Sequence, residues 1–201
     1  MRIGVFGGTF DPPHLGHVIL AAEALEQLAL DRLLWAPVSV PPHKRSKAVS
    51  TLTARLEMVT AIVKGDPRFE LSRVDIDRPG PHYAVDTMAL LAAQFPAAKL
   101  FFLMGGDSLG DLPSWGHAQR FVDSCTGIGV MRRPTDRVAL DKLEAQLPGL
   151  TQKIKFIDTP LLEIASSEIR ERIITGRTYR YYLPPAVFDL IDGDQYYSDQ
   201  G

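Results

Sequence analysis

The sequence is short of cysteine: Cys125 is the only one among 201 residues, so no disulfide can form within the chain. A core that does without disulfides is typical of a reducing compartment, and we expect a cytoplasmic protein. A chain of this length can bury enough apolar surface to fold without a disulfide or a structural metal. The length also suits one domain, which we expect to span residues 1–201.

The chain also lacks an excess of charge of one sign, since it has 22 Lys and Arg residues and 24 Asp and Glu residues. Such a balance provides no general attraction to nucleic acid or to an anionic membrane surface. No apolar run approaches the ~20 residues that a membrane-spanning helix needs. The apolar stretch at residues 3–6 is too short for a signal peptide. We therefore expect neither a nucleic-acid partner nor a membrane partner.

What the sequence does have is a regular alternation of strand-like and helix-like segments. Short runs of β-forming residues predict strands at 3–6, 33–36, 69–71, 99–104, 127–131 and 153–157. Apolar residues at helical spacing predict helices at 16–30, 53–63 (with Thr53 as N-cap), 85–95, 167–175 and 185–192. Strand–helix–strand units pair their strands in parallel. The sequence therefore predicts a doubly wound, Rossmann-like α/β fold with a parallel sheet and a small helical C-terminal part.

Chemistry-bearing residues are densest at residues 7–17, between the first predicted strand and the first predicted helix. In an open α/β sheet ligands bind at the carboxyl ends of the strands, and paired glycines there let a phosphate approach the backbone. The segment is neither the dinucleotide fingerprint nor a phosphate loop ending in lysine, because it contains prolines and ends in histidines. His14 and His17 can face one pocket if the helix begins near Pro13.

Three interpretations of this histidine pair compete. The pair could pack as ordinary side chains at a helix start, although a Gly- and Pro-rich loop is an odd place for packing. It could bind zinc, but zinc would need a third protein ligand and no cysteine cluster is available. We favour the third interpretation, in which the imidazole N–H groups donate to charge developing on a phosphorus centre.

A second polar group, Ser166, Ser167 and Arg170, stands at the start of a predicted helix. One serine could simply cap that helix. Alternatively, the free N–H groups of the helix start, a hydroxyl and a guanidinium together suit a polyphosphate. His43 and Lys44, in a proline-flanked segment without hydrophobic period, could close over the same phosphates or form a solvated basic tip.

Two further groups follow the strongest predicted strand. Gly105 permits close approach of a ligand, and Asp107 can accept a hydrogen bond from a ribose hydroxyl, unless Asp107 or Ser108 serves as a helix N-cap. Trp115 lies in a segment with little packing pattern, where its indole could stack on a flat pyridine ring or be buried as a structural residue. Trp35, in a predicted strand, is expected in the core.

Together these motifs resemble the nucleotidylyltransferase superfamily, which carries a HIGH-type tetrad and transfers nucleotidyl groups from nucleoside triphosphates. Residues 8–17 are similar to its first motif, and residues 164–170 are similar to its second. Within the superfamily the chain looks most like the bacterial nicotinate-nucleotide adenylyltransferases. The shared landmarks cover nearly the whole chain and include Pro41-Pro42-His43-Lys44, Gly106-Asp107-Ser108-Leu109, Trp115, Arg132-Arg133-Pro134 and Leu183-Pro184.

The resemblance implies transfer of the adenylyl group of ATP, with Mg²⁺ carried by the ATP, to nicotinate mononucleotide, giving deamido-NAD and pyrophosphate. It implies catalytic roles for His14, His17, Lys44 and Arg170, and no metal site built by the protein. It implies ATP contacts at Gly8, Thr9, Phe10, His14, His17, Gly105, Asp107, Arg133, Ser166, Ser167 and Arg170. It implies mononucleotide contacts at Thr9, His43, Lys44, Ala84, Asp107 and Trp115, with the nicotinate carboxylate held by backbone N–H groups near Ala84 and Gly116.

Other interpretations remain at this point. The acceptor could be phosphopantetheine, glycerol phosphate or nicotinamide mononucleotide. The chain could be a nucleotide-binding sensor, although a pure binder has no need of transition-state donors such as His14, His17, Lys44 and Arg170. A metal-dependent hydrolase built on the two histidines is a third option. The sequence leaves the oligomeric state open, a homo-oligomer included.

Overall fold

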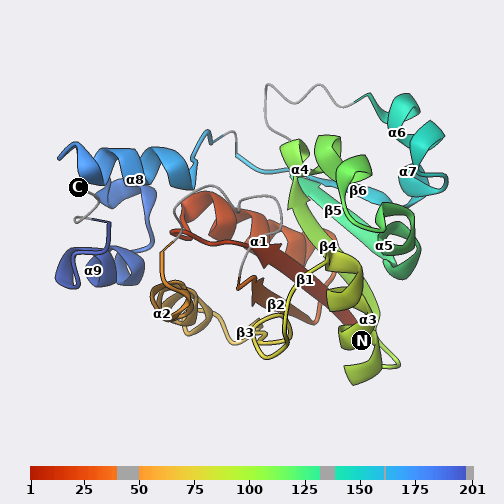
Figure 1. The fold of residues 1–201 in the computed structure, drawn as a ribbon, viewed down its shortest axis with the longest axis horizontal. Coiled ribbons are helices and arrows are strands. Elements are labelled where there is room, and N and C mark those ends of the chain that lie inside the picture. Colours follow the sequence, from red (N-terminus) through yellow and green to blue (C-terminus); the bar gives the residue numbers. More distant parts are fainter. Residues whose placement is uncertain (40–49, 132–138, 161, 198–201) are drawn as a thin grey trace.

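The computed structural model describes residues 1–39, 50–131, 139–160 and 162–197. Within these residues six strands form one parallel sheet in the order β3-β2-β1-β4-β5-β6 (Figure 1). The strands are β1 Arg2–Gly8, β2 Arg32–Pro37, β3 Phe69–Leu71, β4 Lys99–Gly105, β5 Gly127–Met131 and β6 Ile154–Ile157. The predicted parallel sheet is confirmed.

The central strands are apolar because the sheet is covered on both faces. In β1, Ile3 and Val5 pack on one side while Phe6 packs on the other. Helices α1 (Leu15–Gln27) and α2 (Leu52–Val63) supply the core of the Phe6 side, and α3 (Ala84–Gln94) and α5 (Ala118–Ser124) supply that of the opposite side. Parallel strands need such crossover helices, which bury both faces. The fold is doubly wound, as predicted.

Chain order reverses between β1 and β4, which are neighbours in the sheet. Crossovers from β1 run toward β3 on one face, whereas those from β4 run toward β6 on the other. The loops after β1 and β4 therefore diverge and leave a crevice at their carboxyl ends, the usual ligand position in such sheets. Four shorter elements lie between β4 and β6 in the chain: α4 Gly106–Asp111, η1 Leu112–Ser114, α6 Leu140–Gln146 and α7 Leu150–Lys153.

The C-terminal part is a small helical group, as predicted. It contains α8 (Ser166–Ile174), η2 (Arg180–Tyr182) and α9 (Pro185–Gly193), and α9 packs against α2 (Figure 1). Val187 and Ile191 of α9 are fully buried in the same core as α1 and α2. No helix in the described parts of the chain is long and apolar enough to cross a membrane.

The helices differ from the prediction in one cap and in the short helices that were missed. Thr53 is not the N-cap of α2; Thr51 is, and its hydroxyl accepts from the Ala54 N–H at 3.2 Å. The sequence also missed α4, α5, α6 and α7. These helices have seven residues or fewer, so they are too short to show a helical period.

Arg55, in the first turn of α2, has a buried side chain that the sequence did not single out. Its exposed fraction is 1 %, and its guanidinium donates to four carbonyl oxygens: Val38 at 2.7 Å, Ser39 at 2.8 Å, Thr9 at 3.0 Å and Ser50 at 3.3 Å. These carbonyls belong to the loop after β1, the segment after β2 and the start of α2. One cation thus fixes three irregular segments whose carbonyls lie outside the sheet.

Replacing Arg55 by Met should lower the free energy of unfolding by about 3 kcal/mol, because buried carbonyls lose their donor. The matched control is Arg73→Met, which removes an exposed guanidinium that pairs only with Asp77 in the described structure. Urea unfolding of both variants provides the comparison. Equal stability of the two variants would contradict the role given to Arg55.

Candidate active site

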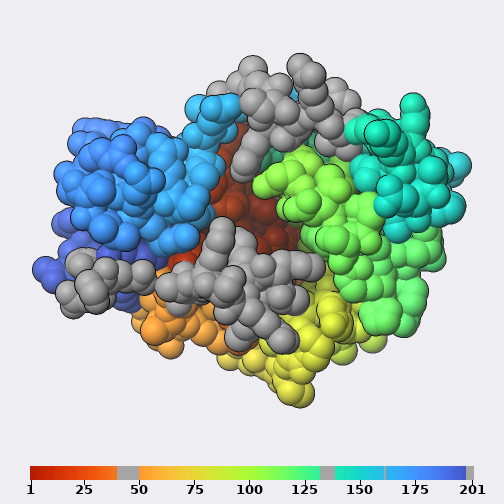
Figure 2. Space-filling model, turned by 45° about the horizontal axis from the view of Figure 1, so that its top comes forward, coloured from red at the N-terminus to blue at the C-terminus, as the bar shows by residue number. Residues whose placement is uncertain are grey.

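A cavity of about 500 Å³ opens at the carboxyl ends of β1 and β4. Figure 2 shows it as a hollow between the C-terminal helices and the green α4 region, with N-terminal residues at its base. Every described residue that the sequence assigned to the site lines it: Gly8, Thr9, Phe10, His14, His17, Ala84, Gly105, Asp107, Trp115, Ser166, Ser167 and Arg170. His43, Lys44 and Arg133 lie outside the described residues.

The loop after β1 is shaped by a buried aromatic ring. Phe10 has a positive φ of 51° and is 2 % exposed, with its ring edge-on to Phe6 and against Trp35. A Cβ at Gly8 would lie 2.8 Å from that ring, so glycine is required there. Packing of Phe10 into the core consequently leaves the backbone of Gly8 and Thr9 at the cavity. Trp35 is fully buried, as expected.

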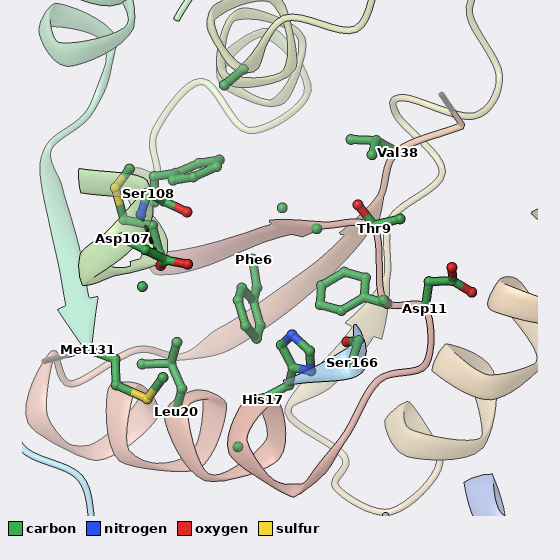
Figure 3. Close-up of a pocket in the computed structure, with 18 of the residues that line it drawn as sticks. Phe6, Thr9, Asp11, His17, Leu20, Val38, Asp107, Ser108, Met131 and Ser166 are labelled. Carbon is green, nitrogen blue, oxygen red and sulfur yellow. Dashed lines mark hydrogen bonds between the residues drawn. The ribbon is translucent and has the colours of Figure 1, made fainter. Parts of the chain in front are cut away.

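The two histidines sit at the start of α1, with His14 as N-cap and His17 in the first turn. Helix α1 begins at Leu15 rather than near Pro13, yet both rings line the cavity, 3.7 Å apart between centroids. The His14 N–H donates to His17 Nδ1 at 3.1 Å. An accepting Nδ1 puts the proton of a neutral imidazole on Nε2. His17, which points into the cavity in Figure 3, is therefore built to donate through Nε2.

The start of α8 lies against this loop, although more than 150 residues separate them. Ser166 Oγ donates to the Pro12 carbonyl at 2.9 Å. Arg170 donates to the Asp11 carbonyl and lies 3.7 Å from the Asp11 carboxylate. The alternative in which a serine simply caps α8 is not met. The N-cap is Ala165, and the Ser166 hydroxyl joins the start of α8 to the loop after β1.

Helix starts converge on the cavity. The N-caps of α1, α3 and α8 are His14, Tyr83 and Ala165, and all three line it. Within the described chain no side chain caps α3 or α8. Their first-turn N–H groups therefore retain the capacity to bind an anion, and the helix dipoles favour one. In a chain of net charge −2, these helix starts thus offer a local capacity to bind an anion.

Asp107 and Ser108 occupy the side of the cavity opposite Thr9 and Asp11 (Figure 3). The N-cap of α4 is Gly105, so neither Asp107 nor Ser108 caps the helix. Instead Asp107 is exposed in the first turn, and its Oδ1 accepts from the Ser108 N–H at 2.9 Å. A Cβ at Gly105 would lie 2.6 Å from that oxygen, so a side chain there would displace the Asp107 carboxylate.

Trp115 lies at the end of the cavity next to Tyr83 and Gly116. Its indole is half-buried and packs on Phe102 and Phe121 with centroids 6.1 and 5.4 Å apart, while also lining the cavity. The ring is therefore both a packing residue and a cavity wall, and its stacking on a pyridine ring stays a prediction. A Cβ at Gly116 would lie 2.5 Å from the Tyr83 ring, so the backbone packs closely on that ring, and Gly116 also lines the cavity.

A buried polar group in the cavity wall was missed by the sequence analysis. Asp75 is 3 % exposed and accepts from Thr87 Oγ1 at 2.8 Å and from Arg78 at 2.7 Å. His82, 7 % exposed, contacts the Arg78 carbonyl through Nε2 at 3.3 Å. Burial, and then the nearby Arg78 charge, lower the pKa of His82. The available signal in the sequence was the pair of opposite charges at Asp75 and Arg78, three residues apart in a segment without hydrophobic period. Such a pair is a weak indication of a site.

Comparison with known proteins places the chain in a family. Residues 5–172 match the family model described as cytidylyltransferase-like. A Thermomicrobium roseum protein, curated as "Probable nicotinate-nucleotide adenylyltransferase", is 42 % identical over 190 residues, covering 94 % of this chain and 88 % of the relative. A Thermus thermophilus protein of the same description is also 42 % identical and covers 93 % and 94 %. The chain belongs to the nicotinate-nucleotide adenylyltransferase family.

Solved structures agree on the family's fold. The Plasmodium falciparum nicotinic acid mononucleotide adenylyltransferase complexed with NaAD superposes with a TM-score of 0.79 at 20 % identity. The match covers 98 % of this chain and 97 % of the Plasmodium chain. At this identity the likeness supports the Rossmann-like architecture, whereas the curated relatives support the family.

The buried His82 predicts a specific pH dependence of stability. Because its pKa is lower in the folded state than in the unfolded chain, only the unfolded chain gains a proton as the pH falls through about 6.5. Stability linked to His82 is thus present above that pH and lost below it.

The non-titrating variant His82→Gln should therefore lose less stability than the wild type between pH 7.5 and pH 5.5. Urea unfolding at the two pH values measures this difference. Parallel losses in the two proteins would show that His82 titrates alike in both states.

Proposed function

We propose that this protein transfers the adenylyl group of ATP to nicotinate mononucleotide, producing deamido-NAD and pyrophosphate for NAD biosynthesis. The relatives at 42 % identity support this assignment, since both are described as nicotinate-nucleotide adenylyltransferases. The observation that carries it is the meeting of the His14–His17 loop with the α8 start, which supplies donors for a polyphosphate from two sides.

The reaction needs positioning and charge stabilisation more than proton transfer. An oxygen of the mononucleotide phosphate forms a bond to the α-phosphorus of ATP, and the bond from that phosphorus to the oxygen leading to the β-phosphate breaks. The electron pair leaves with pyrophosphate. The attacking phosphate is already ionised, so no general base is required, and the site acts by aligning the two groups and stabilising charge.

We assign the transition-state donors to the start of α1. His14, His17 and the backbone of Gly8–Phe10 donate to oxygens of the α-phosphoryl group. The start of α8, with Ser166, Ser167 and Arg170, receives the β- and γ-phosphates and draws charge onto the leaving pyrophosphate. From the family motifs we also propose that Lys44 draws charge onto the leaving pyrophosphate and that Arg133 lies on the adenine side of ATP.

The opposite end of the cavity is assigned to the mononucleotide. Trp115 supplies a flat apolar wall for the pyridine ring, and Asp107 an acceptor for ribose hydroxyls. Backbone N–H groups near Ala84 and Gly116 would bind the ring carboxylate, since the start of α3 is uncapped by any described side chain. Thr9, at the end of β1, lies where the two substrates meet, and His43 completes the proposed mononucleotide contacts.

We propose that Mg²⁺ enters with ATP. Among the described residues no three His, Cys, Asp or Glu side chains are grouped to hold a metal ion. Mg²⁺ is commonly held by phosphate oxygens and water, with few protein ligands, and this supports the proposal. When bound, the ion would supply neutralisation of the phosphate charge.

We further propose that residues 1–201 act as one nucleotidyltransferase domain in the cytoplasm. A nucleotide-binding sensor and a hydrolase built on the two histidines remain the rivals from other classes. Release of pyrophosphate that depends on both ATP and nicotinate mononucleotide supports the transferase; its absence would reject it.

His17→Ala should lower kcat about 10²- to 10³-fold, because a donor to the transition state is lost. Folding should persist, since the half-exposed ring lines a cavity. His17→Gln, which keeps an N–H donor on a side chain of similar reach, should recover part of the loss. Steady-state pyrophosphate release and thermal melting measure both effects. A kcat near that of the wild type in His17→Ala would remove this residue from the mechanism.

The acid substrate should be preferred over nicotinamide mononucleotide by at least about tenfold in kcat/KM. Backbone donors near Ala84 and Gly116 can both bind a carboxylate, whereas a carboxamide sets its own NH₂ against one of them, at a cost of about 1–3 kcal/mol. The preference should persist in Ala84→Ser, because the backbone makes the contact. Trp115→Ala should weaken both substrates alike.

Kinetics with each mononucleotide at saturating ATP decide this point. Equal kcat/KM values would reject the acid-specific assignment while leaving adenylyl transfer intact.

A further inference from the structure

The hydroxyl of Tyr197 reaches the cavity wall from the C-terminal end of the chain. It donates to Asp11 Oδ1 at 2.9 Å, across 186 residues of sequence. Both side chains are buried, Tyr197 at 8 % and Asp11 at 4 % exposure. Asp11 belongs to the same loop as the histidine pair, and it lines the cavity. The C-terminal turn is thus in direct contact with the proposed ATP site.

The backbone at this turn is held in an unusual conformation. Tyr197 has a φ of 74°, in the left-handed region that residues with a side chain rarely adopt. Such a conformation persists only where surrounding contacts enforce it, and these cases gather at functional sites. The preceding Tyr196 makes a different contact, since its hydroxyl donates to Glu57 of α2, outside the cavity.

The Asp11 carboxylate has several competing partners. Oδ1 accepts from Tyr197, whereas Oδ2 lies 3.4 Å from the Ser50 N–H and 3.7 Å from Arg170 Nη1. Arg170 already donates to the Asp11 carbonyl, yet its carboxylate contact is long. Burial, and then the Asp11 charge, raise the pKa of Tyr197 far above its ordinary value. The hydroxyl therefore stays protonated and keeps its place as the donor to Oδ1.

We propose that Tyr197 is a positioning residue of the ATP site, whose hydroxyl satisfies Asp11 and thereby leaves the Arg170 guanidinium directed at the polyphosphate. The inference rests on the proposed function, in which Arg170 binds the leaving phosphates. Without the hydroxyl, Oδ1 is a buried carboxylate oxygen lacking this donor. Arg170 then closes the 3.7 Å gap and forms a direct ion pair with Asp11, which competes with ATP for the guanidinium.

The test compares Tyr197→Phe with the matched control Tyr196→Phe. Each substitution removes one hydroxyl from adjacent residues and keeps the ring. Calorimetric titration with MgATP should show affinity about three- to tenfold weaker in Tyr197→Phe, a coupling of the size found for contacting groups. Tyr196→Phe should bind MgATP as the wild type does. KM for nicotinate mononucleotide should be unchanged in both variants.

A second comparison separates positioning from a general structural effect. In an Arg170→Ala background, Tyr197→Phe should cause no additional loss of ATP affinity, because the guanidinium it positions is absent. An equal loss in both backgrounds, wild-type affinity in Tyr197→Phe, or failure of Tyr197→Phe to fold would each overturn the proposal. The two proposals fail in different ways. A wild-type protein that binds ATP but releases no pyrophosphate would reject the proposed function. Calorimetry requires no turnover, so the ATP affinities of the variants would still decide the role of Tyr197.

Discussion

Parallel pairing of the strands is the constraint on which the site depends. Because all six described strands run in one direction, each connection must return across a face of the sheet, and every carboxyl end lies at the same edge. The reversal of order between β1 and β4 then separates the loops at that edge. Residues distant in sequence, from the loop after β1 to the start of α8, meet there.

Loops at such an edge lack the sheet's hydrogen bonds, and this protein holds them with buried charge. Arg55 binds carbonyls from three segments, and Asp11 contacts the C-terminal turn, Ser50 and Arg170. Isolated burial of either charge would be costly, but each is surrounded by hydrogen-bonding partners. Burial lowers the pKa of Arg55 while the Asp11 charge opposes the shift. The irregular part of the fold is therefore organised by polar contacts as well as by the packing of Phe10.

The contrast between a sheet packed by apolar residues and loops held by long-range polar contacts explains what could be predicted from the sequence. Apolar periodicity located all six strands and the five longest helices because burial acts on each residue locally. The candidate site could be predicted from motif chemistry, and the described residues of those motifs indeed line one cavity. Arg55, Asp75 and Tyr197 could not be found in this way, since their roles depend on partners that only the folded chain brings near. The cap of α8 was missed for the same reason: the Ser166 hydroxyl bonds to Pro12, 154 residues away.

The capacity of the cavity to bind an anion arises from backbone more than from side chains. Three helices of nine residues or more, α1, α3 and α8, begin at its wall, and Arg170 is the described guanidinium that lines it. Fixed backbone dipoles stabilise a polyanion without the reorganisation that flexible lysines would need. They also exert no strong pull on nucleic acid at a distance, which is consistent with a chain of nearly balanced charge. Convergence of these helix starts therefore concentrates the capacity to bind phosphate at one edge of the sheet, and the geometry of that edge determines its position.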